Sequence, residues 1–485
     1  MTARFVAWAL AFVCALVLSS PAAFAQVATR TDKPNIVLIL VDDLGWSDLS
    51  CQGSTFYKTP NIDRLAQEGT RFTNAYSACT VCSPTRAALL TGQYPARLHI
   101  TDWIEGHKRP KAKLRVPDWT MHLPHETTTI AETLKSHGYA TALMGKWHLG
   151  GEEYAPTTHG FDLNVGGNHR GQPPSYFYPY ERPIVKLPGL QEGKEGEYLT
   201  DRLTDEVVRW IEDQRDRPFF LYFSHYTVHT PIQAKAELIE KYQAAVDPSS
   251  PHQNAGYAAM IDSLDQSVGR IVEKLRELKL DQNTIIVFTS DNGGLMRVTS
   301  QPPLREGKGS PYEGGVRIPL IVRFPPHVKA KATSDEPVIT MDLFPTLLDL
   351  AGLTQATQPE TLKNLDGVSI APLLTGKSDK LDRDAIYWHY PHYHPGGSTP
   401  YSAIRSGDYR LVEFFEDGRT ELYNLRDDVG EQNDLSAKEP AKRDELHRKL
   451  IQWREQVGAQ LPTPNPDYAP SAEPAEKTKG KAKKA

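Results

Sequence analysis

NIVLILVDD (residues 35–43) is the stretch that sets the fold, because a continuous apolar run ends there in two adjacent carboxylates. The run extends from Ile36 to Val41, and Asp42 and Asp43 follow it. An apolar run of this length is typical of a strand buried on both faces of a mainly parallel sheet. Three further segments repeat the pattern of a strand followed by polar residues: Ala140–Met144 before Lys146 and His148, Phe219–Phe223 before His225 and His229, and Ile285–Thr289 before Asp291 and Asn292.

Helical patterns separate these four segments. One begins at Thr59-Pro60 and ends at Gly69, one contains Ile130 and Leu134, one runs from Leu203 to Ile211, and a long one runs from Met260 to Leu278. Strands that alternate with helices predict an α/β sandwich. Ligands of such folds bind at the carboxyl ends of the strands, which is where the acids, the histidines and the lysine fall in this chain.

The chain changes character after about residue 375. Short β-like runs at Ala385–Trp388, Ser402–Arg405, Arg410–Phe414 and Glu421–Asn424 precede a helical pattern through Leu446, Leu450 and Trp453. We expect residues 376–462 to form a C-terminal subdomain, a small antiparallel sheet with one helix packed on it. Five lysines crowd the last nine residues after a proline-rich stretch, so residues 463–485 are expected to be a disordered basic tail.

The N-terminus has the layout of a secretory signal. Arg4 precedes an apolar run from Phe5 to Leu18, and Ala23-Phe24-Ala25 follows. We expect residues 1–25 to be a cleaved signal peptide and the mature protein to be periplasmic or secreted. A retained membrane anchor is the alternative, although the run is short, and no interior run predicts stable membrane insertion. The net charge of −5 gives no support for a nucleic-acid partner.

Three cysteines remain after such cleavage: Cys51, Cys79 and Cys82. Cys51 and Cys79 could form a disulfide in an oxidising compartment, or both could be small buried hydrophobic side chains. Cys82 begins the sequence Cys-Ser-Pro-Thr-Arg86. Pro84 suits the first turn of a helix that Gly92 would end, so Cys82 is expected at a helix N-terminus, where an anion is favoured.

Several blocks resemble the sulfatase family of the alkaline-phosphatase-like superfamily, in the family's order: NIVLILVDDLGWSD, TPNIDRLAQEGTRFTNAY, CSPTRAALLTG, GKWHLG, VHTP, TSDNGG and GKGSPYEGGVRIPLIV. The resemblance covers nearly the whole mature chain. It implies a large mixed, mainly parallel sheet between helices, with residues 26–375 as the catalytic domain. It also implies a type I enzyme, in which a maturation enzyme converts Cys82 into formylglycine (3-oxoalanine).

A metal site is expected at two of the strand ends. Asp42, Asp43, Asp291 and Asn292 offer only oxygen atoms, and such ligands select calcium or magnesium over zinc. The family resemblance implies one calcium ion at these matching positions, with the residue at position 82 as a further ligand.

Cationic and imidazole side chains complete the expected catalytic set of Cys82, Arg86, Lys146, His148, His229 and Lys308. Sulfate transfer builds negative charge on oxygen, which the arginine, the two lysines and the metal would neutralise. The resemblance implies that a hydroxyl of hydrated formylglycine attacks sulfur. It also implies that His229 and Lys308 serve the leaving oxygen, and that His148 accepts the proton of the second hydroxyl.

Two loops are candidate substrate-binding segments. His169 and Arg170 lie in a glycine-rich loop, and His389, His392 and His394 lie in the tract WHYPHYH. Their imidazole and aromatic side chains could contact a sugar; the tract could also bind a metal or be a packed aromatic loop.

Hydrolysis of sulfate esters, first of all O-sulfate groups of sulfated carbohydrates, is therefore the expected activity, with a sulfated small molecule or glycan as substrate. A phosphodiesterase or phosphonate monoester hydrolase of the same superfamily is the alternative enzyme. A sulfated-glycan binder without catalysis is the alternative class, if Cys82 is not matured.

Overall fold

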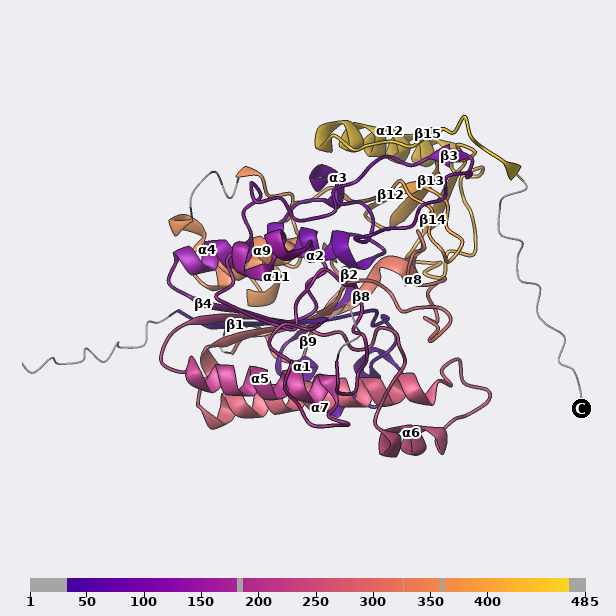
Figure 1. Ribbon diagram of the computed structural model, residues 1–485. Helices are drawn as coiled ribbons and strands as arrows, with labels where there is room; N and C mark the ends of the chain where they lie inside the picture. Colours follow the sequence, from indigo (N-terminus) through magenta and orange to yellow (C-terminus); the bar gives the residue numbers. More distant parts are fainter. Residues whose placement is uncertain (1–32, 181–185, 326, 358–359, 361–362, 471–485) are drawn as a thin grey trace, which may run out of the picture.

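A nine-stranded sheet runs through the middle of the molecule and has helices on both of its faces (Figure 1). The computed structural model describes residues 33–180, 186–325, 327–357, 360 and 363–470, so the predicted signal peptide and residues 471–485 lie outside the described residues. The strands of this sheet are β1 (Asn35–Val41), β2 (Thr70–Tyr76), β4 (Ala140–Gly145), β5 (Leu163–Val165), β6 (Phe219–Ser224), β7 (Thr284–Ser290), β8 (Arg317–Arg323), β9 (Ala332–Ser334) and β10 (Val338–Ile339).

The four predicted strands are neighbours in the sheet. The order is β10-β2-β8-β7-β1-β6-β4-β5, and β9, the ninth strand, pairs with β2 off this path. Strands β7, β1, β6 and β4 are parallel. Their carboxyl ends therefore lie along one edge, as the positions of the polar residues predicted. β8 pairs antiparallel with both β7 and β2, which makes the sheet mixed.

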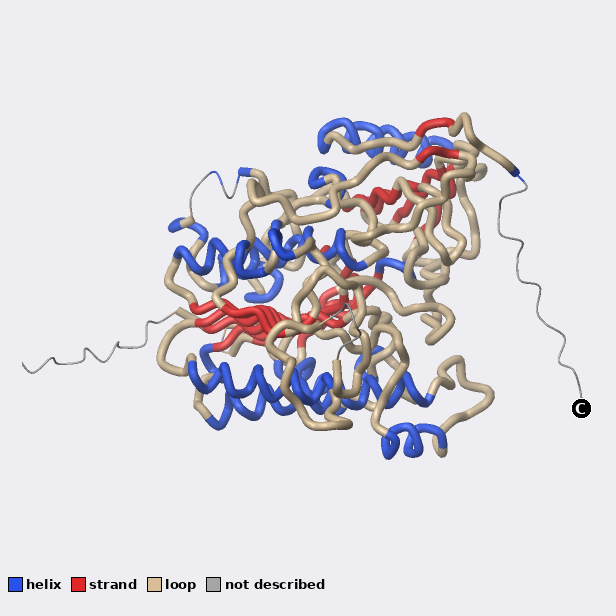
Figure 2. Tube along the Cα trace, viewed as in Figure 1, coloured by secondary structure: helices blue, strands red, loops and turns tan. Residues whose placement is uncertain are grey.

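Both faces of β1 are buried, which confirms the interpretation of its continuous apolar run. Val37, Ile39 and Val41 pack into one hydrophobic cluster, and the alternate residues pack into a second cluster on the opposite face. The described helices are α1 (Pro60–Glu68), α2 (Cys82–Thr91), α3 (Pro95–Leu98), α4 (Ile130–Ser136), α5 (Leu199–Asp213), α6 (Ala236–Gln243), α7 (Ala255–Glu277), α8 (Glu313–Val316), α9 (Leu343–Leu350), α11 (Ala371–Thr375) and α12 (Pro440–Val457). In Figures 1 and 2, α1, α5 and α7 cover one face of the sheet, and α2, α4, α9 and α11 cover the other.

The small C-terminal sheet is also present. β11 (Ile386–Tyr390), β12 (Tyr401–Ser406), β13 (Tyr409–Phe414) and β14 (Thr420–Asn424) pair antiparallel in chain order. α12 packs on this sheet through Leu446, Leu450 and Trp453, the three residues of the predicted helical pattern.

The structure differs from the predicted tail at its beginning. β15 (Thr463–Pro464) pairs antiparallel with β3 (Leu114–Arg115), and the backbone N–H groups of Asn465 and Ala469 donate to carbonyl groups of Lys113 and Lys111. Backbone pairing thus continues past residue 463, and the proline-rich composition gave no sign of this distant partner. No helix within the described ranges is long and apolar enough to cross a membrane.

Candidate active site

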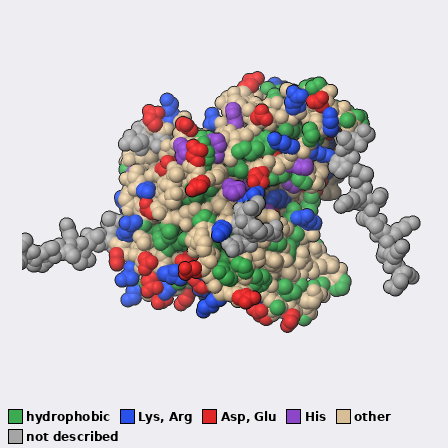
Figure 3. All heavy atoms as spheres, viewed as in Figure 1, with side chains coloured by type: hydrophobic (Ala, Val, Ile, Leu, Met, Phe, Trp, Pro, Cys, Tyr) green, Lys and Arg blue, Asp and Glu red, His purple; other side chains and the backbone are tan. Residues whose placement is uncertain are grey.

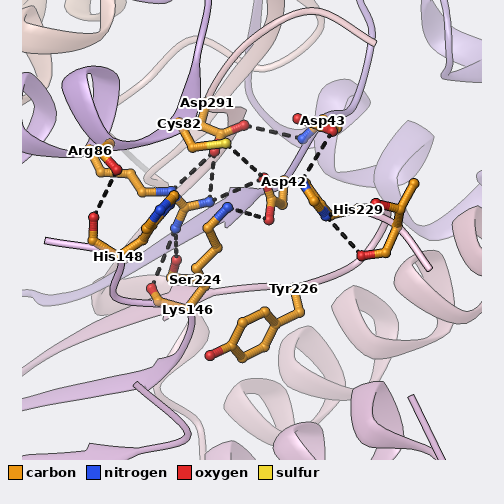
Figure 4. A network of polar contacts seen from close by, with 12 residues as sticks. Asp42, Asp43, Cys82, Arg86, Lys146, His148, Ser224, Tyr226, His229 and Asp291 are labelled. Carbon is orange, nitrogen blue, oxygen red and sulfur yellow. Dashed lines mark hydrogen bonds and ion pairs between the residues drawn. The ribbon is translucent and has the colours of Figure 1, made fainter. Parts of the chain in front are cut away.

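The residues that follow β1 and β7 meet at the edge of the sheet (Figure 4). Asp42 and Asp43 follow β1, and Asp291 and Asn292 follow β7. Asp43 adopts a left-handed backbone conformation, with φ of 61°, and its N–H group donates to Asp291 Oδ1 at 3.1 Å. This turn aims both carboxylates of the β1 end into the same space.

Cys82 is the first residue of α2, as its sequence context predicted. The helix begins after Val81 and ends at Gly92, whose φ of 70° suits glycine, and all ten of its residues are buried. Cys82 Sγ lies 3.7 Å from Asp42 Oδ1, and Lys308 Nζ lies 3.4 Å from Sγ. Burial raises the pKa of the Cys82 thiol to about 12, so the unmodified side chain is a neutral thiol.

Arg86 lies one turn further along α2 and binds the acidic residues from within the protein. Its Nη2 and Nε atoms lie 2.7 and 3.1 Å from Asp291 Oδ2, and Nη2 lies 3.6 Å from Asp42 Oδ1. The side chain is fully buried and does not line the cleft above the site. Arg86 therefore orients carboxylates of the acidic cluster, and its predicted role in neutralising charge on the sulfate stays a prediction.

Lys146 and Lys308 each hold one carboxylate of the β1 end. Lys146 Nζ lies 2.7 Å from Asp42 Oδ2, and Lys308 Nζ lies 2.6 Å from Asp43 Oδ1. Burial, together with the charge of Asp291, raises the pKa of Asp42 to about 7 despite Lys146. Burial alone would also raise the pKa of Asp43, but the charge of Lys308 and the hydrogen bonds from Lys308 and Asn292 outweigh it and hold that pKa well below its usual range.

The oxygen atoms around Asp43 fit a hard cation. Asp43 Oδ2 and Asn292 Oδ1 are buried and have no hydrogen-bond partner. Buried polar atoms in native proteins normally have a partner, so two unpartnered oxygens on residues that contact each other suggest a ligand at this place. Asp42, Asp43, Cys82 and His229 also offer donor atoms within 4.8 Å of one another. Asn292 Nδ2 donates to Asp43 Oδ1 at 2.8 Å, which places the amide beside this group.

His148 is held in one tautomer by its neighbours. Its Nε2 lies 3.1 Å from the carbonyl oxygen of Ile104, which can only accept, so the proton is on Nε2 and Nδ1 carries a lone pair. Nδ1 is buried and has no partner. The hydroxyl of Ser83 donates to the carbonyl of His148, and a side chain on Gly171 would collide with the imidazole ring. Burial and the charges of Lys146 and Arg86 lower the pKa of His148 well below its usual value.

His229 has the opposite tautomer. Its Nδ1 lies 2.8 Å from the carbonyl oxygen of Thr230, so Nδ1 carries the proton, and Nε2 faces Asp43 Oδ2 at 3.7 Å. Burial lowers its pKa to about 3, against the attraction of Asp43. Two neutral imidazoles thus present lone pairs to the same site from different strand ends.

A cleft of about 670 Å³ opens above these residues. It is lined by Asp43, Val81, Cys82, Trp103, Ile104, Glu105, Gly106, His148, His169, Arg170, Gly171, Gln172, His229, Thr230, Leu295, Met296, Arg297, Lys308, His394, Pro395 and Gly396. The cleft therefore includes His169, Arg170 and His394 of the candidate substrate-binding residues. Cys82 and Lys308 lie at the same surface as these three residues.

His389 and His392 do not line the cleft. His389 is bonded to Ser402 Oγ and to the carbonyl of Gln460, and His392 to Thr101 Oγ1. Both side chains are buried, as in the packed aromatic loop that was the alternative for this tract. Only His394 reaches the cleft, because the chain has left β11 by then and its ring packs on Gly309.

Sequence patterns missed several residues of the site. Trp103, Glu105 and Arg297 lie in loops without a periodic pattern. The sequence also gave no sign of a role for Ser83, the residue after Cys82. Ser83 accepts from the N–H of Ile104 at 3.0 Å and so joins α2 to the wall of the cleft. Cys51, Cys79 and Cys82 are free thiols in the structure, so Cys51 and Cys79 are not joined.

Two family descriptions match this chain. "Sulfatase" matches residues 34–353, and "N-sulphoglucosamine sulphohydrolase, C-terminal" matches residues 308–456. The first match covers more than half of the chain and includes every residue described above at the strand ends and on α2.

Individual proteins give the same result. A protein of Formosa agariphila described as a sulfatase is 35% identical over an alignment of 495 residues, which covers 87% of this chain and 88% of that one. Human N-acetylgalactosamine-6-sulfatase is 34% identical over 381 residues, 73% of this chain and 68% of that one. The crystal structure of Ps i-CgsB in complex with k-i-k-neocarrahexaose superimposes with a TM-score of 0.73 at 32% identity and covers 90% of this chain and 94% of that one.

Proposed function

The chain belongs to the sulfatase family and is a sulfuric ester hydrolase, and from this premise we propose that it removes O-sulfate groups from sulfated carbohydrates with a formylglycine made from Cys82 and one calcium ion. One observation carries the proposal. Cys82 stands at the N-terminus of α2, beside the carboxylates that follow β1 and within 3.4 Å of a lysine. The helix N-terminus and the lysine favour the binding of an anion such as a sulfate group next to residue 82.

We propose that Asp42, Asp43, Asp291 and Asn292, with the residue at position 82, hold the calcium ion. The unpartnered oxygens of Asp43 and Asn292 support this, since both require a donor or a cation. When bound, calcium would act as a Lewis acid toward an oxygen of the sulfate group. Arg86 and Lys146 would keep the acidic cluster in place, because each binds one of its carboxylates at 2.7 Å.

Formylglycine, as its hydrate, would supply two geminal hydroxyls, one as nucleophile toward sulfur and one to expel sulfate afterwards. The protein's own residues serve both stages. The free N–H groups at the start of α2 and the ammonium of Lys308 stabilise the negative charge that develops on oxygen.

Proton transfer is assigned from the two tautomers. His148 has a lone pair on the buried Nδ1 and accepts a proton, while its N–H stays bonded to the Ile104 carbonyl. Lys308 donates toward the leaving oxygen, because its ammonium lies at the cleft surface. His229 assists there only after taking up a proton on Nε2, since its other nitrogen donates to Thr230.

Sulfated carbohydrates are proposed as the substrate class. The names of two relatives refer to a sulfated amino sugar and to an oligosaccharide ligand. The cleft wall carries Trp103, His169 and His394, side chains suited to a sugar ring and its hydroxyls. The predicted signal peptide would direct the enzyme to the periplasm or the cell exterior, where it would meet such polymers.

The experiment is sulfate release by the protein co-produced with a formylglycine-generating enzyme. The substrates are an aryl sulfate, defined sulfated mono- and disaccharides, an aryl phosphodiester and a phosphonate monoester. We expect sulfate from the first two groups and loss of release in Cys82→Ala. Cys79→Ala is the matched control, because Cys79 is an equally buried thiol three residues away. Hydrolysis of the phosphorus esters without sulfate release would favour the alternative enzyme. Saccharide binding without hydrolysis would favour the non-catalytic binder.

A further inference from the structure

Two arginines stand at the cleft, on loops far apart in sequence. Arg170 follows β5, and Arg297 lies in the loop after β7. Both line the same cleft as Cys82 and Lys308. Neither arginine contacts the acidic cluster that would hold calcium, so their charges serve some other purpose.

Arg170 is held by an acidic neighbour but keeps unused donors. Its Nη1 lies 2.8 and 3.0 Å from the two carboxylate oxygens of Glu105, and Asn168 Oδ1 accepts from its backbone N–H. Nε of Arg170 is buried and has no partner. A guanidinium has five N–H donors in a fixed plane, and a buried donor without an acceptor is costly. Glu105 thus fixes the guanidinium through Nη1 and leaves its Nε, at the wall of the cleft, without an acceptor among the described residues.

Arg297 is exposed and uncompensated. Within the described ranges it makes no hydrogen bond, ion pair or ring contact. Its neighbours on the same wall, Leu295 and Met296, are apolar, and Met296 is 43% exposed. A cation beside apolar surface at a cleft is well placed to meet an anionic group of a ligand.

The charges of the cleft leave a positive excess. Among the described lining residues the acids are Asp43 and Glu105, and each is paired, with Lys308 and with Arg170. Arg297 has no such partner. The excess is local, because acidic and basic side chains are interspersed over the face that Figure 3 shows.

We propose that Arg170 and Arg297 form a second anion subsite, which binds a carboxylate or sulfate group of the substrate other than the sulfate that is cleaved. The substrate is then a polyanionic glycan, with at least two negative groups on neighbouring sugars, and not a neutral sugar with a single sulfate. This inference rests on the proposed sulfatase activity and specifies its substrate class. Guanidinium groups suit the role because they bind both oxyanions through two parallel hydrogen bonds.

The test compares three disaccharides with one cleavable sulfate: one otherwise neutral, one with a second sulfate and one with a uronate carboxylate. An aryl sulfate reports the chemistry alone. The variants are Arg170→Gln, Arg297→Gln and the double variant, with Arg64→Gln as the control, an exposed arginine of α1 that does not line the cleft. For the doubly anionic disaccharides, each cleft variant should lower kcat/KM by about 10- to 100-fold, mainly through KM. Added salt should raise the same KM.

The expected pattern is a preference of the unmodified protein for one or both doubly anionic disaccharides, lost in the cleft variants and kept in Arg64→Gln. The anion that is preferred identifies the group as sulfate or carboxylate. Equal losses on all substrates, the aryl sulfate included, would overturn the proposal, as would unchanged kinetics or no preference in the unmodified protein. If the unmodified protein released no sulfate from any substrate, the proposed activity would fail first, so the two failures are distinguishable.

Discussion

Each carboxylate of the acidic cluster has a cationic partner. Asp42 pairs with Lys146, Asp43 with Lys308, and Asp291 with Arg86, each at 2.6 or 2.7 Å. Such pairing is required because a buried charge without a partner is strongly destabilising. Only Lys308 of the three cations reaches the cleft. The three cationic side chains therefore differ in role. Lys146 and Arg86 hold carboxylates in position, whereas Lys308 can also contact a ligand in the cleft.

Lys308→Ala should lower kcat for an aryl sulfate by about 10²- to 10³-fold, because a contact that acts in the transition state is lost. The side chain of Lys308 is only 11% exposed and binds Asp43. The variant should therefore also melt at a lower temperature when calcium is absent. Turnover per folded enzyme, measured with calcium, separates the two effects, and Lys377→Ala, at an exposed position, is the control. Near-wild-type kcat would reject the role of Lys308.

Elements place these residues through contacts that lie behind the cleft. The hydroxyl of Tyr257 on α7 donates to Asp48 Oδ2 at 2.7 Å and lies 3.2 Å from the carbonyl of Asp43. Asp48 also accepts from the N–H of Gly45 and from Thr299. This network joins a helix to the turn after β1, and so fixes the backbone that carries the acidic pair.

Tyr257→Phe should cost about 1–2 kcal/mol of unfolding free energy and also reduce activity, because the turn after β1 loses its support. Tyr242→Phe is a matched control: its hydroxyl donates to Asp262 at 2.9 Å, and it does not line the cleft. Thermal unfolding and kcat of both variants give the comparison. We expect similar losses of stability, with reduced kcat only for Tyr257→Phe; equal kcat in both would mean that the network has no part in positioning the site.

Removal of the metal tests whether the residues that follow β1 and β7 form one calcium site. Exhaustive chelation should reduce both activity and melting temperature, and calcium should restore both better than zinc, since the predicted ligands are oxygens. Asp43→Asn, Asp291→Asn and Asn292→Ala should each weaken the calcium-dependent rise in melting temperature. Full activity after verified removal of metal would refute the calcium site.

At the scale of the whole molecule, continuous patterns were predictable and distant pairings were not. The apolar run of β1 and the acids after it predicted a buried strand that ends in a cluster of acidic side chains, and Pro84 and Gly92 predicted the helix that carries Cys82. The antiparallel direction of β8 was not predicted, because a buried apolar run has the same pattern in either direction. Two features depend on contacts between distant segments, which no local pattern records. They are the pairing of residues 463–464 with residues 114–115 and the position of His394 at the wall of the cleft.

A buried ion network joins the C-terminal sheet to the main sheet. Glu313 accepts from Arg317 and from Arg410 of β13, and Glu431 accepts from the N–H of Glu313 at 2.7 Å. Arg305, three residues before Lys308, donates to the carbonyl of Glu431. The C-terminal sheet thus supports the loop that carries Lys308.

The two glutamates of this network should respond to pH in opposite ways. Burial, together with the charge of Glu313, raises the pKa of Glu431 to about 8. The neutral form of Glu431 therefore stabilises the fold fully below about pH 4.5, and this stabilisation is lost as the pH rises toward 8. Burial opposes the shift at Glu313, but Arg410 and Arg317 lower its pKa, so its contribution is present above about 4.5 and is lost in acid.

As the pH is raised from 5 to 8, we therefore expect the melting temperature of the unmodified protein to decrease more than that of Glu431→Gln. Glu313→Gln should be less stable than the unmodified protein at pH 8, and the gap should narrow below about pH 4.5. If the melting temperatures of all three proteins changed with pH in parallel across this range, the pKa values of the two carboxyl groups would not be shifted in opposite directions.

The most direct test of the account is the chemical state of residue 82 in active protein. The peptide containing Cys82, from protein matured in the cell, would be examined by mass spectrometry before and after reaction with a hydrazide, which captures aldehydes. We expect an aldehyde at position 82, in a fraction of molecules that rises in proportion to sulfate-releasing activity across preparations. A preparation that turns over sulfate esters many times with Cys82 present only as the thiol would contradict it.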